Sequence, residues 1–109
     1  MNERKLVSTN FQYSDAGQIA FVTFDNAAWA NCLSCDVINE IRYAFCALNN
    51  NSSLRVIVLK SAGKGEFCAG ADLKELSGFD LNKARSYTCD LHATIGAIRT
   101  SQVPVIARI

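Results

Sequence analysis

The feature that most constrains the fold is a short apolar strand pattern placed between two helical patterns. The run Leu54-Arg55-Val56-Ile57-Val58-Leu59-Lys60 is dense in β-branched residues and follows the polar loop 49–53, which predicts a strand buried on both faces. Helical spacing of apolar residues precedes this run and also follows it. Because strands that alternate with helices usually pair in parallel, the sequence predicts an α/β fold with a largely parallel element.

The segments before this run predict a hairpin and a helix. Residues 5–14 and 18–25 are rich in alternating β-branched and aromatic side chains around the turn sequence Asp15-Ala16-Gly17, which is typical of a β-hairpin. Apolar residues then recur at helical spacing over 35–49, with Ser34 as a candidate N-cap. The chain is therefore expected to open with two strands and a helix.

The segments after the run predict two helices and a final strand. Asp72 can cap a short helix through about Ser77, Asp80 can cap a longer helix, and residues 103–109 form a strand. The expected order is therefore β-β-α-β-α-α-β. On the longer helix, the apolar spacing predicts a buried stripe formed by Leu81, Ala84, Thr88, Leu91, Ile95 and Ile98.

Composition excludes several classes of protein. The chain has 109 residues, of which 50% are hydrophobic, and 11 basic and 10 acidic residues give a formal net charge of +1. A nucleic-acid-binding protein would show an excess of clustered cations, and a membrane-spanning helix would need about 20 consecutive apolar residues. We therefore expect one domain without nucleic-acid or membrane partners. The N-terminus lacks the apolar stretch of a secretory signal, which favours a cytoplasmic location.

The five cysteines indicate a reducing compartment. Their number is odd, so free thiols are expected rather than a disulfide framework. One alternative stays open, because Cys32, Cys35, Cys89 and His92 could together bind a structural zinc ion. The simpler interpretation is that the cysteines act as small buried hydrophobic residues, and no metal is expected.

The loop between the apolar strand and the short helix is the best candidate for a site. The small residues Ala69-Gly70-Ala71 stand directly before Asp72, and the first N–H groups of a helix have no intrahelical acceptor. Such N–H groups can bind an oxyanion or a phosphate group, and small side chains let a ligand approach the backbone. The alternative is that these residues only form a tight turn from strand to helix. Gly63 and Gly65 lack the pattern of a nucleotide-binding loop, which favours a simple turn there.

Three motifs in order along the chain resemble one family. The stretch Phe67-Cys68-Ala69-Gly70-Ala71-Asp72-Leu73-Lys74-Glu75 resembles the first signature of the enoyl-CoA hydratase/isomerase (crotonase) family. Residues 23–34 stand where that family shows T-L-N-R-P-x-x-L-N-A-L-S, and Pro104-Val105-Ile106-Ala107 is similar to its P-V-I-A strand. The resemblance implies an incomplete crotonase-like spiral of β-β-α units, with residues 1–109 as the N-terminal part of a single domain.

The resemblance also implies an activity and a set of site residues. Family members hydrate or isomerise 2-enoyl-CoA, hold the thioester oxygen between two backbone N–H groups and need no cofactor besides the acyl-CoA substrate. The N–H of Ala71 would be the first of these oxyanion donors. The residues implied to line the CoA site are Trp29, Ala69, Gly70, Ala71, Asp72 and Leu73.

Departures from the family pattern limit what the chain is expected to do alone. Asn26 and Ala27 stand where the family has Arg-Pro, so a cation near the expected CoA path is missing. In the family, the second oxyanion donor and the acid/base glutamates follow the P-V-I-A strand, and the complete enzymes form trimers. Glu66 and Glu75 flank the loop, but we expect them to be solvated rather than catalytic. The chain is therefore expected to be an acyl-CoA-binding part of such an enzyme. The alternative is a non-catalytic CoA-binding or assembly module.

Overall fold

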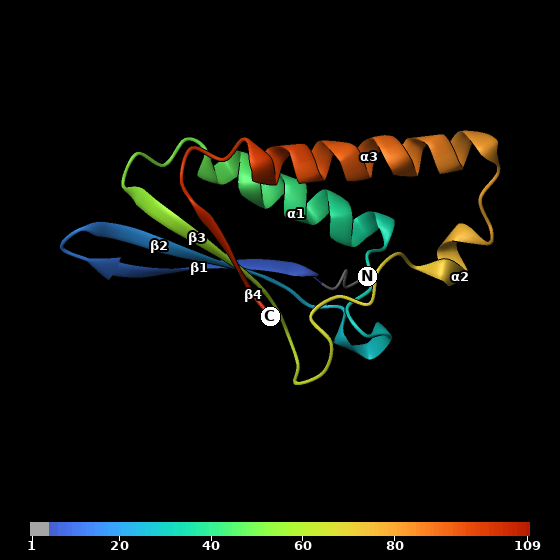
Figure 1. The fold of residues 1–109 in the computed structure, drawn as a ribbon, viewed down its shortest axis with the longest axis horizontal. Coiled ribbons are helices and arrows are strands. Elements are labelled where there is room, and N and C mark those ends of the chain that lie inside the picture. The colour runs from blue at the N-terminus through green and yellow to red at the C-terminus, as the bar shows by residue number, and fades with distance from the viewer. Residues whose placement is uncertain (1–4) are drawn as a thin grey trace.

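The computed structural model describes residues 5–109 as one sheet with two long helices on one of its faces (Figure 1). Along the chain the elements are β1 (Val7–Ser14), β2 (Gly17–Phe24), the 3-10 helix η1 (Ala27–Trp29), α1 (Cys35–Leu48), β3 (Leu54–Ser61), α2 (Leu73–Leu76), α3 (Leu81–Arg99) and β4 (Val105–Arg108). The predicted order of strands and α-helices is confirmed, and η1 is the one element that the sequence did not predict. Among the described residues, no helix is long and apolar enough to span a bilayer.

The sheet has the strand order β1-β2-β3-β4. The pair β1–β2 is the predicted antiparallel hairpin, while β2–β3 and β3–β4 are parallel. The hairpin turn depends on Gly17, whose φ is +132° and whose added Cβ would lie 2.7 Å from the carbonyl oxygen of Ser53. Because β2 and β3 are parallel, their carboxyl ends meet at the same edge of the sheet.

The core lies between α1 and the sheet. The helix begins as predicted, with Ser34 Oγ accepting a hydrogen bond from the N–H of Val37 at 3.3 Å. Its apolar residues at helical spacing are buried, namely Val37, Ile38, Ile41, Phe45 and Leu48. All of them except Ile38 belong to one cluster with buried residues of β2 and β3, including Phe24 and Ile57.

The prediction that the apolar strand is buried on both faces is wrong. In β3, Leu54 and Ile57 are buried, but Val56 and Val58 remain partly exposed. Both long helices lie on the same side of the sheet (Figure 1), so within residues 5–109 no second helical layer covers the other side. A run of β-branched residues suits a covered face and a partly open face equally, and the sequence pattern could not distinguish the two.

The predicted buried stripe of α3 is wrong over most of its length, although Ile98 packs against the core. Leu81 is 67% exposed and Ile95 is 46% exposed, whereas the buried residues of α3 are Tyr87 and Thr94. The helix packs mainly along α1, and both hydroxyls reach carbonyl oxygens at that boundary: Tyr87 donates to Leu33 at 2.8 Å, and Thr94 donates to Ile38 at 3.0 Å. The buried side of α3 therefore carries two hydroxyl groups that form hydrogen bonds. A prediction based only on the spacing of apolar residues does not find that side.

Candidate functional site

Two segments far apart in the sequence form the site where β2 and β3 end. Residues 26–34 follow β2, and residues 62–72 follow β3. The N–H of Leu33 donates to the carbonyl of Gly70 at 2.7 Å, and the N–H of Ala69 donates to the carbonyl of Ala30 at 3.2 Å. The parallel pairing of the two strands thus brings two separate sequence motifs into direct contact.

Asn31 holds these two segments together. Its side chain is 2% exposed and makes three hydrogen bonds of 2.9 Å: Oδ1 accepts from the N–H of Asn26, and Nδ2 donates to the carbonyls of Ala62 and Glu66. Its φ of +54° lies in the left-handed region, which asparagine tolerates better than most residues. The sequence motif contained Asn31, but its role was not predicted, since no local pattern shows which distant carbonyls a side chain reaches.

Asn26 adds a second buried tie within the first segment. Its Nδ2 donates to the carbonyl of Cys32 at 2.9 Å, and its side chain is also buried. The residue at this position therefore fixes the course of the chain between β2 and α1. Asn26 thus makes buried hydrogen bonds at a position where the family motif has a cationic arginine.

The backbone turns sharply at Gly70, between two exposed alanines. Gly70 has a φ of +101°, and a Cβ added there would meet no atom within 4 Å, so glycine is needed for its conformation rather than for space. Ala69 and Ala71 are exposed. Within residues 5–109, the N–H of Ala71 donates to no acceptor. It is therefore a donor that an external oxygen atom can use.

Asp72 and Glu75 stabilise this loop through hydrogen bonds to backbone N–H groups. Asp72 Oδ1 accepts from the N–H of Glu75 at 3.0 Å and so caps α2, and Glu75 Oε1 accepts from the N–H of Cys35 at 2.8 Å. The expectation that Glu75 is merely solvated is wrong, because its half-buried carboxylate satisfies the first turn of α1. Since α2 has only four residues, the free donor at Ala71 belongs to the loop rather than to a long helix dipole.

Exposed side chains border the same loop. Leu73 is 78% exposed and Trp29 is 64% exposed. The ammonium group of Lys74 lies 5.8 Å from the centroid of the Trp29 ring. Lys74 was not predicted as a site residue, because only the fold places the end of the loop beside η1.

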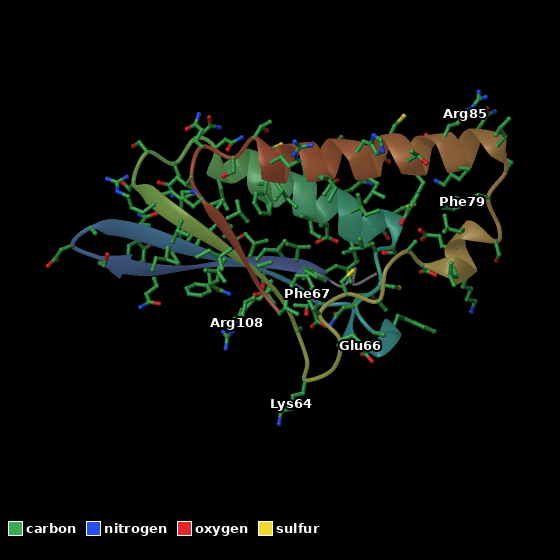
Figure 2. The ribbon with its side chains drawn as sticks, viewed as in Figure 1. Lys64, Glu66, Phe67, Phe79, Arg85 and Arg108 are labelled. Atoms are coloured by element: carbon green, nitrogen blue, oxygen red, sulfur yellow. The ribbon has the colours of Figure 1, made fainter. Side chains whose placement is uncertain are left out.

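The outer part of the loop differs from its inner part. Lys64 extends away from the sheet (Figure 2) and Glu66 is exposed, whereas Phe67 packs edge-on against Phe24 with ring centroids 5.4 Å apart. Behind Phe67 and Cys68 lies an apolar cavity of about 140 Å³ between the sheet, α1 and α3. The loop is thus anchored on its inner side and open to solvent at its tip.

The thiols of Cys32 and Cys35 are not activated. Burial raises the pKa of the Cys32 thiol, and the negative charge of Asp72 adds to this effect. Burial, followed by the hydrogen bond to Glu75, raises the pKa of Cys35 to about 11. Both groups are neutral thiols at neutral pH, whereas a cysteine nucleophile must be a thiolate. In the described part of the chain, no three His, Cys, Asp or Glu residues lie together as a metal site, so the zinc alternative lacks a ligand cluster.

Comparison with known proteins identifies the family. The model of the enoyl-CoA hydratase/isomerase family matches residues 14–109, which is most of the chain. The chain belongs to the enoyl-CoA hydratase/isomerase family. The resemblance drawn from the three sequence motifs is thereby confirmed.

Solved structures of family members share this fold. An enoyl-CoA hydratase from Mycobacterium smegmatis is 28% identical, with a TM-score of 0.86, over 97% of this chain and 40% of that chain. An enoyl-CoA hydratase from Bacillus anthracis is 27% identical, with a TM-score of 0.84, over 94% of this chain and 39% of that chain. The predicted crotonase-like fold, in incomplete form, is confirmed.

Curated relatives from the same family are considerably longer than this chain. A probable mitochondrial enoyl-CoA hydratase 2 of Arabidopsis thaliana is 31% identical over 88% of this chain and 32% of its own length. The mitochondrial methylglutaconyl-CoA hydratase of Homo sapiens is 33% identical over 84% of this chain and 27% of its own length. The chain thus spans about a third of the length of such relatives.

Proposed function

We propose that the loop Ala69–Leu73 binds an acyl-CoA thioester and that the N–H of Ala71 donates a hydrogen bond to the thioester oxygen. The observation that carries this proposal is the N–H of Ala71, an exposed residue, which has no acceptor among residues 5–109. The family supplies the reaction class, because the relatives are named as hydratases and isomerases of enoyl-CoA. The proposed reaction is therefore the hydration or isomerisation of a 2-enoyl-CoA.

The chemistry of the proposed step follows from where negative charge develops. Attack of water at the β-carbon of a 2-enoyl-CoA and removal of a proton from its γ-carbon both place negative charge on the thioester oxygen. A donor fixed by the backbone stabilises that charge without reorganising, and losing one such donor typically costs about 3–4 kcal/mol in the transition state. Because this charge is larger in the transition state than in the substrate, the Ala71 donor would act on the rate rather than only on binding.

The remaining loop residues suit binding of the CoA part. The small side chains of Ala69 and Ala71 leave the backbone accessible on either side of Gly70, and Asp72 fixes the end of the loop by capping α2. The exposed Trp29 and Leu73 offer apolar surface for the adenine and pantetheine groups. Lys74, 5.8 Å from the Trp29 ring, would supply the cation that a CoA phosphate group needs.

The proposal assigns the acid/base step to groups outside these residues. Glu75 already accepts a hydrogen bond from the N–H of Cys35, and Glu66 lies exposed in the outer part of the loop. We propose that a second oxyanion donor, the catalytic glutamates and the trimer contacts come from family segments that follow the P-V-I-A motif. Residues 1–109 alone would then bind acyl-CoA with very little turnover. The cytoplasmic location stays a prediction, since the relatives from Arabidopsis thaliana and Homo sapiens are mitochondrial by name.

Binding is tested by titrating the ¹⁵N-labelled chain with butyryl-CoA, a saturated thioester that cannot be hydrated. We expect the Ala71 amide resonance to shift, because its N–H gains an acceptor. Ala69→Trp should block the exposed backbone and weaken binding, while Ala93→Trp, on the exposed side of α3, should leave binding unchanged. An unmoved Ala71 resonance, or equal effects of the two tryptophan variants, would contradict the proposed site.

Turnover is tested with crotonyl-CoA, a short 2-enoyl-CoA, on the complete gene product and on residues 1–109. We expect the complete product to consume it and residues 1–109 to consume almost none. Rapid turnover by residues 1–109 would refute the assignment of the acid/base groups. A complete product that binds butyryl-CoA but consumes no enoyl-CoA would instead establish the non-catalytic CoA-binding module.

A further inference from the structure

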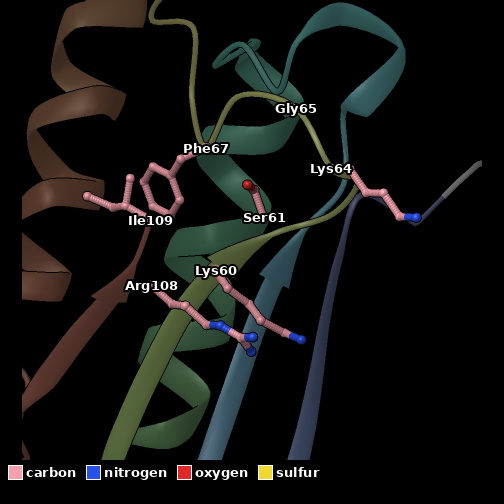
Figure 3. Close-up of a pocket in the computed structure, with 8 residues that line it drawn as sticks. Lys60, Ser61, Lys64, Gly65, Phe67, Arg108 and Ile109 are labelled. Carbon is pink, nitrogen blue, oxygen red and sulfur yellow. The ribbon is translucent and has the colours of Figure 1, made fainter.

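A second concave surface lies where β3 and β4 end, and it lacks the residues of the proposed acyl-CoA site. This pocket has a volume of about 300 Å³, and its polar lining includes Lys60, Ser61, Lys64, Gly65 and Arg108 (Figure 3). None of the residues Ala69–Leu73 contributes to it. Ligands of open α/β sheets usually bind at the carboxyl ends of parallel strands, and this pocket occupies that position in the β3–β4 pair.

The ionisable side chains of the pocket are all positive. Lys60, Lys64 and Arg108 line it together with the apolar side chains of Phe67 and Ile109, and no Asp or Glu side chain does. Within residues 5–109, none of these cations has a carboxylate within ion-pairing distance or makes a hydrogen bond. Three cationic side chains thus share one small concave surface with no acidic side chain from the described part of the chain.

Two of these cations are held next to each other by the sheet. Lys60 and Arg108 are register partners across the parallel β3–β4 pair. Ile57 and Val105 of the same strands pack toward the core, so strand alternation places Lys60 and Arg108 on the side of the sheet that lacks helices. Figure 3 shows their side chains running alongside each other on that side. Like charges directly opposite on neighbouring strands repel, and a bound anion between them would reverse that effect.

The polar ends of these side chains are free to bind. The ammonium group of Lys60 lies 5.8 Å from the centroid of the Phe21 ring, a contact that orients it and uses none of its three N–H donors. Arg108 offers a planar set of donors that matches two oxygens of one tetrahedral anion. Ser61 adds a hydroxyl group, and Lys64 adds a further cation from the loop.

We infer that this pocket binds a phosphate group through Lys60 and Arg108. A phosphate group has several strong acceptor oxygens and about two negative charges at neutral pH, which suits three unpaired cations better than the single charge of a carboxylate. The inference rests on the register and charge of β3 and β4 and does not depend on the proposed acyl-CoA site. The phosphate group can belong to a free phosphate compound or to a larger phosphate-bearing ligand such as coenzyme A.

The test titrates the ¹⁵N-labelled chain with sodium pyrophosphate at constant ionic strength. We expect the amide resonances of Lys60, Ser61 and Gly65 to shift in a saturable manner. K60Q/R108Q should weaken the binding at least about tenfold, because it removes two charge-assisted hydrogen bonds. The matched control is K83Q/R85Q, which removes the same charge at the far end of α3 (Figure 2) and should leave the dissociation constant within about twofold.

Two results would overturn the inference. One is no saturable shift at these three amides up to 10 mM pyrophosphate. The other is an equal loss of affinity in the two double variants, which would mean that only the net charge matters. A competition experiment with coenzyme A then distinguishes the sources: displacement of pyrophosphate supports a phosphate group of CoA, and retention at saturating coenzyme A supports a free phosphate compound.

Discussion

Replacing Asn31 by alanine should remove a substantial part of the stability of this chain. The variant loses three buried hydrogen bonds of 2.9 Å, at about 1 kcal/mol each. It also places alanine at a φ of +54°, which costs about 1 kcal/mol more than asparagine in the left-handed region. The expected loss is therefore about 4 kcal/mol, against a total of about 5–15 kcal/mol for a typical domain.

The free energy of unfolding is measured by urea denaturation followed by circular dichroism. Asn50→Ala is the matched control, because Asn50 is an exposed turn residue and its replacement should change stability by less than about 0.5 kcal/mol. Asn31→Gly relieves the φ strain but not the lost hydrogen bonds, so it should be about 1 kcal/mol more stable than Asn31→Ala. A loss below 1 kcal/mol for Asn31→Ala, or a loss equal to that of Asn50→Ala, would refute the reasoning.

Three further predictions concern the hairpin, a buried thiol and the CoA surface. Gly17→Ala should destabilise the chain by about 2 kcal/mol or more, because the new Cβ would lie 2.7 Å from a carbonyl oxygen and the residue has a φ of +132°. Gly65→Ala is the control: its Cβ would meet nothing within 4 Å, so it should leave the stability unchanged in the same urea assay. Burial, followed by the hydrogen bond to Glu75, raises the pKa of Cys35 from 9.0 to about 11. The stability contributed by this neutral thiol is therefore present below pH 9 and is lost as the pH rises toward 11. In a Cys35→Ser variant, the free energy of unfolding should not show this decline between about pH 9 and 11. Lys74→Ala should weaken butyryl-CoA binding several-fold in calorimetry, whereas Lys83→Ala should not; equal affinities would remove Lys74 from the site.

The fold could be predicted from the sequence wherever one element decides its own structure. Helix α1 begins at its Ser34 cap and buries the spaced apolar residues, as the pattern requires. The predictions were wrong where the burial of one element depends on its contacts with another. The exposure of Val56 depends on whether a layer covers that face of β3, and the buried side of α3 depends on carbonyl groups of other segments that accept from Tyr87 and Thr94.

The same distinction applies to the candidate site. The small residues around Gly70 predicted an accessible backbone, and the structure places them at the surface with a positive φ at Gly70. The roles of Asn31 and Glu75 could not be predicted, since the partners that tie them to other segments lie 31 to 40 residues away in the sequence. Sequence spacing shows which backbone can be approached by a ligand, but it does not show what holds that backbone in place.

The proposed donor is a backbone atom, and this determines where substitutions should matter. The side chain of Ala71 makes no part of the donor, so small replacements such as Ala71→Ser should preserve the N–H and much of the butyryl-CoA binding. The position of that N–H depends instead on Asn31, through Ala62 and Glu66, and on Glu75, through Cys35. Glu75→Gln keeps an acceptor oxygen for the N–H of Cys35, whereas Glu75→Ala removes it. We therefore expect Glu75→Ala to weaken butyryl-CoA binding and Glu75→Gln to restore most of it, because the carboxylate supports the loop through a hydrogen bond rather than through proton transfer.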